Sequence, residues 1–363
     1  MPRSLPQIAP SAEALAAALD ARTAPSPLAA REDDERVRCL ACAHRCALED
    51  GARGICGVRF ARGGELWAPR GYVARAYVRP VEINTVYHVL PGALALTFGM
   101  YGCDLRCPYC HNHNVSQALR DGGAGERPRD VTAKALVDEA VAAGCRVVVS
   151  AYNEPLVTAE WAREVFAEAK ARGLVTAMIS DGNATPEVLG YLRPVTDVFR
   201  VDLKGATQEQ LRKLGGRLEP VLASIREARR LGYWVEVVTL VVPGLNDDAG
   251  SLRTIAREIV SIAPDVPWHL NGFYPRYRMK DRRPTPAGLL FDAAATAYAL
   301  GLSFVYVGNV EDQLAELCHT RCPRCHETLV RRAAYATVEN RVARGACGAC
   351  GEIVPGLWGG PAE

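Results

Sequence analysis

Short apolar, β-branched runs alternate with amphipathic helical runs from Leu94 to Val307, and this alternation constrains the fold more than any other feature of the chain. The runs that predict strands span residues 94–98, 146–150, 174–180, 197–203, 233–241, 267–270 and 303–307. Strands separated by helices run parallel, with right-handed crossovers. We therefore expect an α/β domain, either a doubly wound sheet or a full or partial β/α barrel. No Gly-x-Gly-x-x-Gly follows the first run, so we favour the barrel.

Helix boundary signals lie between these runs. Thr207 and Gln210 predict a capping box, and Thr185 and Thr285 each precede a proline, so we expect both threonines to be N-caps. An apolar stripe at helical spacing over residues 252–262 predicts a helix after the fifth strand.

The chain holds 13 cysteines in 363 residues, and most of them lie in three tight clusters. An odd, clustered set argues against a disulfide framework, and the first ten residues lack the charged and apolar regions of a signal peptide. We therefore expect reduced, metal-binding thiolates in a cytoplasmic protein. No apolar run approaches the roughly 20 residues of a membrane helix. The formal net charge of +2 gives no reason to expect a membrane or a nucleic acid as partner.

The rhythm of the sequence divides the chain into four parts. Residues 1–36 combine an Ala-rich helical stretch with prolines and a charged run, which predicts a flexible N-terminal arm. Residues 37–92 form a Cys-rich module, and residues 93–310 carry the predicted barrel. Residues 311–363 hold five cysteines and Gly-rich turns, as expected of a small module stapled by a metal.

Three cysteines follow the first predicted strand with the spacing C-x3-C-x2-C. They are Cys103, Cys107 and Cys110. Three thiolates on one short loop suit an iron–sulfur cluster, and because a cubane has four irons, one iron keeps an open position for a substrate. Zinc is the alternative, with His111 or His113 closing the site, but a three-cysteine loop without a nearby fourth thiolate is a poor structural zinc site.

Polar motifs follow the next three strands. A β/α barrel places its active site at the carboxyl ends of the strands, so these motifs are expected to meet there. Lys204, one of only five lysines, can pair with a carboxylate. A histidine on the sixth strand joins the set. The candidates are Asn153, Glu154, Asp181, Asn183, Asp202, Lys204 and His269.

Two further cysteine sets flank the barrel. The C-terminal set has two C-x2-C pairs separated by 21 residues and predicts a zinc ribbon, with rubredoxin-like iron as the alternative. The N-terminal set is unevenly spaced and fits zinc or an auxiliary iron–sulfur cluster equally, with His44 as a substitute ligand. The two sets are Cys322, Cys325, Cys347 and Cys350, and Cys39, Cys42, Cys46 and Cys56.

The three-cysteine loop resembles that of the radical S-adenosylmethionine (radical SAM) superfamily. Flanking motifs resemble more narrowly the AmmeMemoRadiSam-system radical SAM enzymes, relatives of the pyruvate formate-lyase activating enzyme. The resemblance covers about residues 37–358, and its motifs lie at residues 39–46, 54–59, 87–92, 306–310 and 355–358. It implies a partial (β/α)6-type TIM barrel with small metal-binding modules at both ends.

The resemblance also implies a chemistry. The amino and carboxylate groups of SAM chelate the open iron of a 4Fe–4S cluster. An electron from a donor such as flavodoxin or ferredoxin then cleaves SAM to methionine and a 5'-deoxyadenosyl radical, which abstracts hydrogen from a substrate. By resemblance, the three loop cysteines ligate the cluster, Tyr109 packs near adenine, and the candidate polar residues position SAM. The partner would be a protein substrate or another protein of the AmmeMemo system.

Two other functions remain open. A glycyl-radical-enzyme activase is favoured by Cys110-His111-Asn112 and Asp202-Leu203-Lys204, but not by the flanking cysteine modules. A non-catalytic zinc protein, whose tail binds nucleic acid or protein, is the alternative of another class. Residues 80–85 and 269–273 depart from the usual family sequence near the expected active site, so no substrate is carried over.

Overall fold

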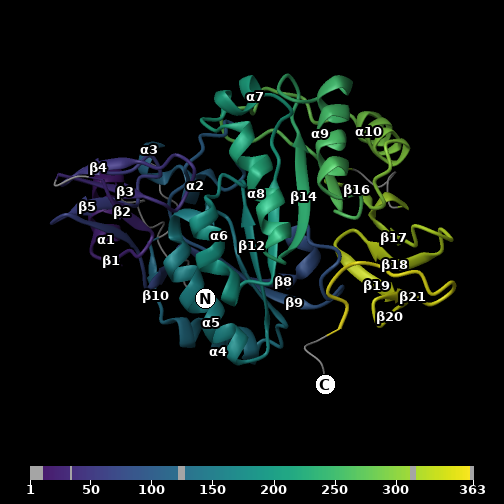
Figure 1. Cartoon of the computed structure of the whole chain (residues 1–363), viewed down its shortest axis with the longest axis horizontal. Coiled ribbons are helices and arrows are strands. Elements are labelled where there is room, and N and C mark those ends of the chain that lie inside the picture. Colours follow the sequence, from purple (N-terminus) through teal and green to yellow (C-terminus); the bar gives the residue numbers. More distant parts are fainter. Residues whose placement is uncertain (1–10, 33–34, 122–126, 311–315, 360–363) are drawn as a thin grey trace, which may run out of the picture.

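The structure is a computed structural model that describes residues 11–32, 35–121, 127–310 and 316–359. At its centre is an eight-stranded sheet with the order β16-β15-β14-β13-β12-β11-β9-β8 (Figure 1). All of these strands are parallel except β8 (Arg75–Pro80), which pairs antiparallel with β9. Within the described residues β8 and β16 do not pair with each other, so the barrel is partial and open, as predicted.

Each predicted parallel strand is present. The strands are β9 (Leu94–Gly99), β11 (Val147–Ser150), β12 (Val175–Ser180), β13 (Val198–Asp202), β14 (Trp234–Val241), β15 (Trp268–Gly272) and β16 (Val305–Gly308). The main crossover helices are α4 (Ala133–Ala142), α5 (Ala159–Ala171), α6 (Pro186–Leu192), α8 (Leu218–Arg230), α9 (Ala249–Ile262) and α10 (Ala287–Ala299). Shorter elements are β7 (Tyr72–Val73), β10 (Arg129–Asp130), α2 (His113–Ser116), α3 (Ala118–Asp121), α7 (Gln208–Lys213), and 3-10 turns at Val81–Asn84, Pro155–Thr158 and Arg193–Val195.

Both faces of the central sheet are buried. Successive side chains of a strand point to opposite faces. Phe98 and Phe199 pack with the helices in one apolar cluster, whereas Val149 and Ala177 belong to a second cluster inside the barrel. Parallel strands buried on both sides need nearly continuous apolar runs. This requirement explains why the strands could be read from the sequence.

Two of the three predicted helix caps are confirmed. Thr207 and Gln210 form the capping box of α7, and Thr185 accepts a hydrogen bond from the backbone N–H of Val188 at 3.1 Å. The prediction for Thr285 is wrong. Helix α10 begins at Ala287, and the Thr285 hydroxyl instead accepts from the N–H of Phe273 at 2.8 Å.

The N-terminal module is built from more of the chain than its cysteine segment. It contains α1 (Ala12–Asp20), β1 (Thr23–Pro25), β2 (Ala29–Arg31), β3 (Arg36–Cys39), β4 (Ala47–Glu49), β5 (Phe60–Arg62) and β6 (Glu65–Pro69). Strands β1 and β2 each join a three-stranded sheet, and Leu15 and Leu19 of α1 are buried in the core. Residues 11–32 therefore differ from the flexible arm predicted for residues 1–36, because the apolar face of α1 is covered. Residues 1–10 and 33–34 lie outside the described residues.

A C-terminal module lies on the other side of the barrel from the N-terminal module (Figure 1). It consists of β17 (Thr320–Arg321), β18 (Thr328–Ala333), β19 (Ala336–Asn340), β20 (Val342–Ala343) and β21 (Ala346–Cys347). Its tail pairs with the chain that precedes β9, because Leu357 donates to His88 O at 2.7 Å and accepts from Leu90 N at 2.8 Å. Residues 311–315, where this module was predicted to begin, lie outside the described residues. Among the described helices, none combines the length and the apolar character needed to span a bilayer.

Candidate active site

A cavity lies at the carboxyl ends of β11, β12 and β13. Most of the side chains predicted from the sequence line it together: Cys103, Cys107, Cys110, Asn153, Glu154, Asp181, Asp202 and Lys204. They come from different loops, and the parallel strands bring those loops to one edge of the sheet. The structure therefore brings these eight side chains together, but Asn183 and His269 do not line the cavity.

The three-cysteine loop is held in place by its neighbours. Arg120 donates to Cys103 O at 2.6 Å and to Leu105 O at 2.8 Å. The backbone N–H of Arg106 donates to Leu214 O at 2.8 Å. All 13 cysteines are free thiols, so no disulfide shapes the loop. The loop therefore presents three fixed sulfur atoms to the cavity.

These thiols need a cation to ionise. Burial raises the pKa of Cys107 to about 12, although the charge of Lys204 acts to lower it. Burial also raises the pKa of Cys103 and of Cys110. A metal cluster supplies the missing positive charge, and its binding releases the thiol protons. The donor set therefore fits an iron–sulfur cluster.

Glu154 ties the ends of two strands together. Its carboxylate accepts hydrogen bonds from Ser180 Oγ at 2.8 Å, from Leu156 N at 3.0 Å and from Asp181 N at 2.7 Å. Burial raises the pKa of Glu154 well above its usual value, and the charge of Asp181 adds to this rise, while the hydrogen bonds oppose it. The side chain is thus fixed in orientation before any ligand binds.

The segment before Glu154 packs unusually close to β9. Asn153 accepts from the N–H of Met100 at 3.0 Å, and Tyr152 has a positive φ of 73°. A Cβ added to Gly99 would lie 2.4 Å from Ala151 O, so only glycine fits at this strand end. This contact sets the position of the Glu154 loop relative to the cysteine loop.

Asp202 lies between two cations. Lys204 Nζ donates to Asp202 Oδ2 at 2.9 Å, and Arg200 pairs with the other carboxylate oxygen. Burial acts to raise the pKa of Asp202, but the two cations outweigh it and the pKa is lowered. Arg200 was missed in the sequence, although its position two residues before Asp202 puts both on one face of β13.

A second acidic group lies beside Cys103. Ligand atoms of Cys103, Asp104 and Asp181 lie within 4.8 Å of one another. Asn183 Nδ2 donates to Asp104 Oδ2 at 2.7 Å, whereas Asp104 Oδ1 and Asp181 Oδ2 are buried without a partner. Burial raises the pKa of Asp104 to about 6, and Glu154 adds to the rise. Asp104 was not predicted, although it stands within the cysteine motif.

Unpartnered donors also lie at this site. Arg200 Nε and Asn84 Nδ2 are buried without hydrogen-bond partners, and both residues line the cavity. Unpaired acceptors and donors at one site fit a ligand that carries both an ammonium and a carboxylate group, as an amino acid does.

The family comparisons agree with this site. The profile of the radical SAM superfamily matches residues 98–253. An uncharacterized protein of Methanocaldococcus jannaschii is 33% identical over 327 residues, which cover 89% of this chain and 96% of that protein. The pyruvate formate-lyase 1-activating enzyme of Escherichia coli is 31% identical over 179 residues, 46% of this chain and 68% of that enzyme. The chain belongs to the radical SAM superfamily.

Members of the radical SAM superfamily are enzymes, and the family implies a 4Fe–4S cluster and SAM. Among solved structures, a radical SAM methyltransferase from Sphaerobacter thermophilus is similar with a TM-score of 0.48 and 14% identity, covering 82% of this chain and 80% of that chain.

Three predicted SAM-site residues do not line the cavity: Tyr109, Asn183 and His269. Tyr109, within the radical SAM loop, is buried in an apolar cluster with Val242 and Phe273. Asn183 does not line the cavity either, and it donates a hydrogen bond to Asp104, beside Cys103. Neither Tyr109 nor Asn183 therefore contacts the cavity directly.

His269, which the resemblance implies as a residue that positions SAM, lies in a different cluster and does not line the cavity. Its Nε2 lies 2.6 Å from Glu236 Oε2, and its ring stacks on Tyr306 with centroids 5.0 Å apart. Burial acts to raise the pKa of Glu236, but hydrogen bonds, first among them that from His269, lower it to about 2. Glu236 also accepts from the N–H of His88 at 2.9 Å, in the segment that pairs with the C-terminal tail.

The C-terminal cysteines form a compact four-sulfur site. Cys322 and Cys350 Sγ lie 3.6 Å apart, Cys325 and Cys347 Sγ lie 3.7 Å apart, and all four lie within 4.8 Å of one another. A zinc–sulfur bond of about 2.3 Å gives a tetrahedron with an edge of about 3.8 Å. The site therefore fits one tetrahedral metal ion.

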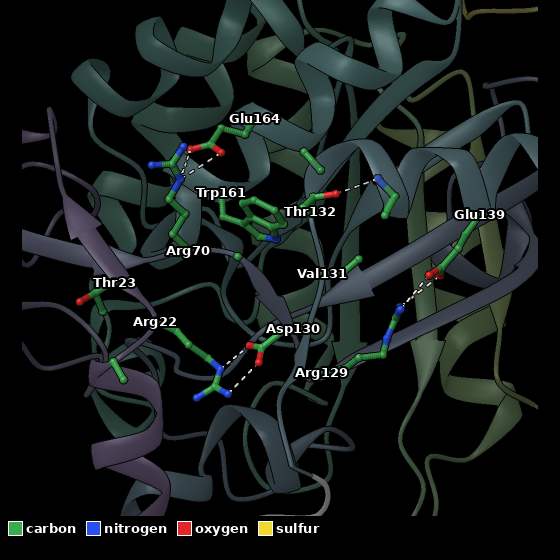
Figure 2. Close-up of a pocket in the computed structure, with 14 residues that line it drawn as sticks. Arg22, Thr23, Arg70, Arg129, Asp130, Val131, Thr132, Glu139, Trp161 and Glu164 are labelled. Carbon is green, nitrogen blue, oxygen red and sulfur yellow. Dashed lines mark hydrogen bonds and ion pairs between the residues drawn. The ribbon is translucent and has the colours of Figure 1, made fainter.

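A second pocket lies outside the barrel, between α1, β10 and α5 (Figure 2). All three arginines that line it lie in ion pairs: Arg22 with Asp130, Arg70 with Glu164, and Arg129 with Glu139. These charges are mutually compensated, so we assign the pocket no role in the chemistry.

Proposed function

We propose that this protein reductively cleaves SAM and uses the resulting 5'-deoxyadenosyl radical to abstract hydrogen from a substrate. The observation that carries the proposal is the meeting of the radical SAM cysteines with Glu154, Asp181 and Lys204 around one cavity. Cys103, Cys107 and Cys110 would hold the 4Fe–4S cluster, which supplies the electron for cleavage of the C–S bond.

The cavity residues divide by charge into two recognition groups. Glu154 and Asp181 offer carboxylate acceptors suited to an amino group, while Asn153 holds the loop of Glu154 in place. Lys204 and Arg200 offer cations suited to a carboxylate, and Asp202 keeps both oriented. The two groups thus match the two ends of an amino-acid moiety.

Apolar side chains complete the cavity wall. Ile83, Leu105 and Ile179 line it beside the charged groups. Such walls exclude water and limit side reactions of a reactive intermediate. Ile83 belongs to the segment at residues 80–85 that departs from the usual family sequence, so we propose that this segment shapes the substrate end of the cavity.

We propose a reduced, cytoplasmic setting, an electron donor of the flavodoxin or ferredoxin class, and zinc in the C-terminal site. Support comes from the 13 free thiols and from the tetrahedral sulfur spacing. The assignment to the AmmeMemoRadiSam system, with a protein substrate or partner, rests on the flanking motifs of the sequence.

A second candidate is activation of a glycyl-radical enzyme. It is supported by relatives such as the pyruvate formate-lyase-activating enzyme of Listeria monocytogenes, which is 29% identical over 214 residues, 53% of this chain and 82% of that enzyme. An organic glycyl radical detected by electron paramagnetic resonance in a partner enzyme would support it.

Anaerobic reconstitution tests the main proposal. The protein loaded with iron and sulfide should form 5'-deoxyadenosine and methionine from SAM under strong reduction. Cys107→Ala should abolish the product, whereas Cys145→Ala, at a buried cysteine outside the cavity, should retain it. Absence of 5'-deoxyadenosine with an intact cluster would falsify the proposal.

A further inference from the structure

We propose that the N-terminal cysteines hold a second iron–sulfur cluster, placed next to the radical SAM loop. Its ligands are Cys39, Cys42, Cys46 and Cys56. The proposal stands independently of SAM cleavage, because it rests on the spacing and surroundings of these four thiols.

The four thiols converge on a small volume. A Cβ added to Gly54 would lie 3.7 Å from Cys46 Sγ and 3.9 Å from Cys56 Sγ, so both sulfurs face the same turn. Cys39 N donates to Cys46 O at 2.9 Å, which places these two residues side by side. Cys42 is buried in the turn between them, where the N–H of Arg45 donates to Cys42 O at 3.0 Å. The set is therefore one site.

The spacing of the sulfurs separates this site from a zinc site. In the C-terminal set all four Sγ atoms lie within 4.8 Å of one another. Of the N-terminal sulfurs, all of which the structure describes, no three lie that close together. A single tetrahedral zinc ion requires sulfur separations of about 3.8 Å. The N-terminal set is too open for such an ion.

The radical SAM loop provides a second comparison within the same chain. The three sulfurs of this loop, all of which the structure describes, also do not lie within 4.8 Å of one another. They belong to Cys103, Cys107 and Cys110. A cubane binds each thiolate through a different iron, so its ligands are spread more widely than those of one ion. The sulfurs of the N-terminal set are thus spread more widely than those of a single-ion site, as are the sulfurs of the loop.

A buried cation lies beside the N-terminal thiols. Arg59 is 1% exposed and pairs with Glu160, and its carbonyl accepts from the N–H of Gly54 at 2.8 Å, in the turn that Cys46 and Cys56 Sγ face. Its Nε has no hydrogen-bond partner. An iron–sulfur cluster bound by four thiolates carries a net negative charge. A buried guanidinium with an unpaired N–H can stabilise that charge.

His44 is not needed as a ligand. Its Nε2 lies 3.7 Å from Asp104 Oδ2 and belongs to no group of metal-ligating atoms among the described residues. Four cysteines ligate all four irons of a cubane. The second cluster therefore has no open iron, and SAM chemistry stays with the radical SAM loop.

The two sites are joined by direct contacts. Arg120 donates to Cys103 O at 2.6 Å and to Ile55 O at 2.5 Å, so one guanidinium links the loop to the residue before Cys56. A Cβ on Gly102 would lie 2.7 Å from Val58 Cγ2, which shows how tightly the two segments pack. The proposed cluster is thus adjacent to the first one.

Metal analysis of a chain that lacks the first cluster tests the proposal. The variant Cys103→Ala, Cys107→Ala, Cys110→Ala, reconstituted anaerobically with iron and sulfide, should keep about four irons and four sulfides per chain. It should also show the resonance signal of a reduced 4Fe–4S cluster. A chain that binds zinc but no iron in this background would overturn the proposal.

Further substitutions locate the cluster. Adding Cys46→Ala should remove the remaining iron, whereas adding Cys145→Ala should leave it in place. Because Cys46→Ala can disturb folding, Cys46→Ser in the same background gives an independent readout: an oxygen ligand should shift the resonance signal of the cluster. Iron retained with an unshifted signal in both Cys46 variants would contradict the assignment. Formation of 5'-deoxyadenosine plays no part in either readout.

Discussion

Lys204 donates a hydrogen bond to Asp202 across 2.9 Å, and both side chains face the cavity that the radical SAM cysteines line. The lysine is held by the aspartate rather than free to turn into solvent. Because Arg200 also binds Asp202, the three residues form a fixed charge pattern at the end of β13.

This pattern predicts the effect of Lys204→Gln. Hydrogen bonds to a charged group contribute about 1.5–3 kcal/mol, so loss of the cation should weaken SAM binding about tenfold to a hundredfold. Equilibrium binding of SAM to the reconstituted protein measures the effect. Lys213→Gln, at an exposed lysine paired with Glu209, is the matched control and should bind SAM normally. Equal SAM affinities of the two variants would show that Lys204 does not contribute to SAM binding.

The close approach at Gly99 predicts a large effect from one methyl group. Gly99→Ala would place Cβ 2.4 Å from Ala151 O and 2.9 Å from Tyr152 Cβ. Overpacking of this kind costs about 1–3 kcal/mol, so the free energy of unfolding should fall by that amount and SAM binding should weaken. Gly190→Ala in α6 meets nothing within 4 Å and should be neutral or slightly stabilising. Denaturant unfolding of both variants makes the comparison, and similar stabilities would contradict the packing argument.

Burial of His88 predicts a loss of stability in acid. Burial lowers the pKa of His88 to about 4, although the charge of Glu236 acts to raise it. Below about pH 6.5 the unfolded chain binds a proton at this imidazole, whereas the folded chain does so only near pH 4. The free energy of unfolding should therefore fall by about 3 kcal/mol between pH 6.5 and pH 4.

The variant His88→Gln isolates this contribution. It keeps a polar side chain but cannot titrate, so its thermal midpoint should depend less steeply on pH over that interval. Protonation of the metal-binding thiolates affects both proteins and cancels in the difference. Parallel pH profiles of the two midpoints would show that His88 does not titrate as described.

The C-terminal metal site predicts that its zinc can be lost without loss of iron from the rest of the chain. Cys347→Ala should remove about one equivalent of zinc per chain while iron content stays unchanged, because this site shares no ligand with the cavity. A metal-stapled module this small loses its fold without the ion. Limited proteolysis should then cleave within residues 316–359 of the variant and spare them in the wild type. Resistance equal to that of the wild type would show that the metal does not hold the module.

The strands could be predicted well because their burial on both faces leaves an apolar run within a few consecutive residues. β11 and β12 are buried on both faces, so their apolar runs stand out. β8 was missed because three of its six residues are exposed and its pairing with β9 depends on the rest of the fold. The N-terminal helix α1 was predicted, but its packing was not, since the partners of Leu15 and Leu19 are distant in the sequence.

The candidate site shows the same division. The strand ends located Glu154, Asp181, Asp202 and Lys204, because a barrel gathers those ends wherever its sequence places them. The surroundings of the His269 side chain could not be predicted from its position at a strand end. Its ring turns toward Glu236 on the neighbouring strand, and that partner is apparent only once the register of β14 and β15 is known.

The pairing of Leu357 with His88 and Leu90 has a consequence for ligand access. Leu357 packs against the apolar cluster inside the barrel, so the tail plugs the end opposite the cavity. A ligand is therefore expected to reach the cavity from the carboxyl ends of the strands, where the cysteine loop and the polar side chains line it.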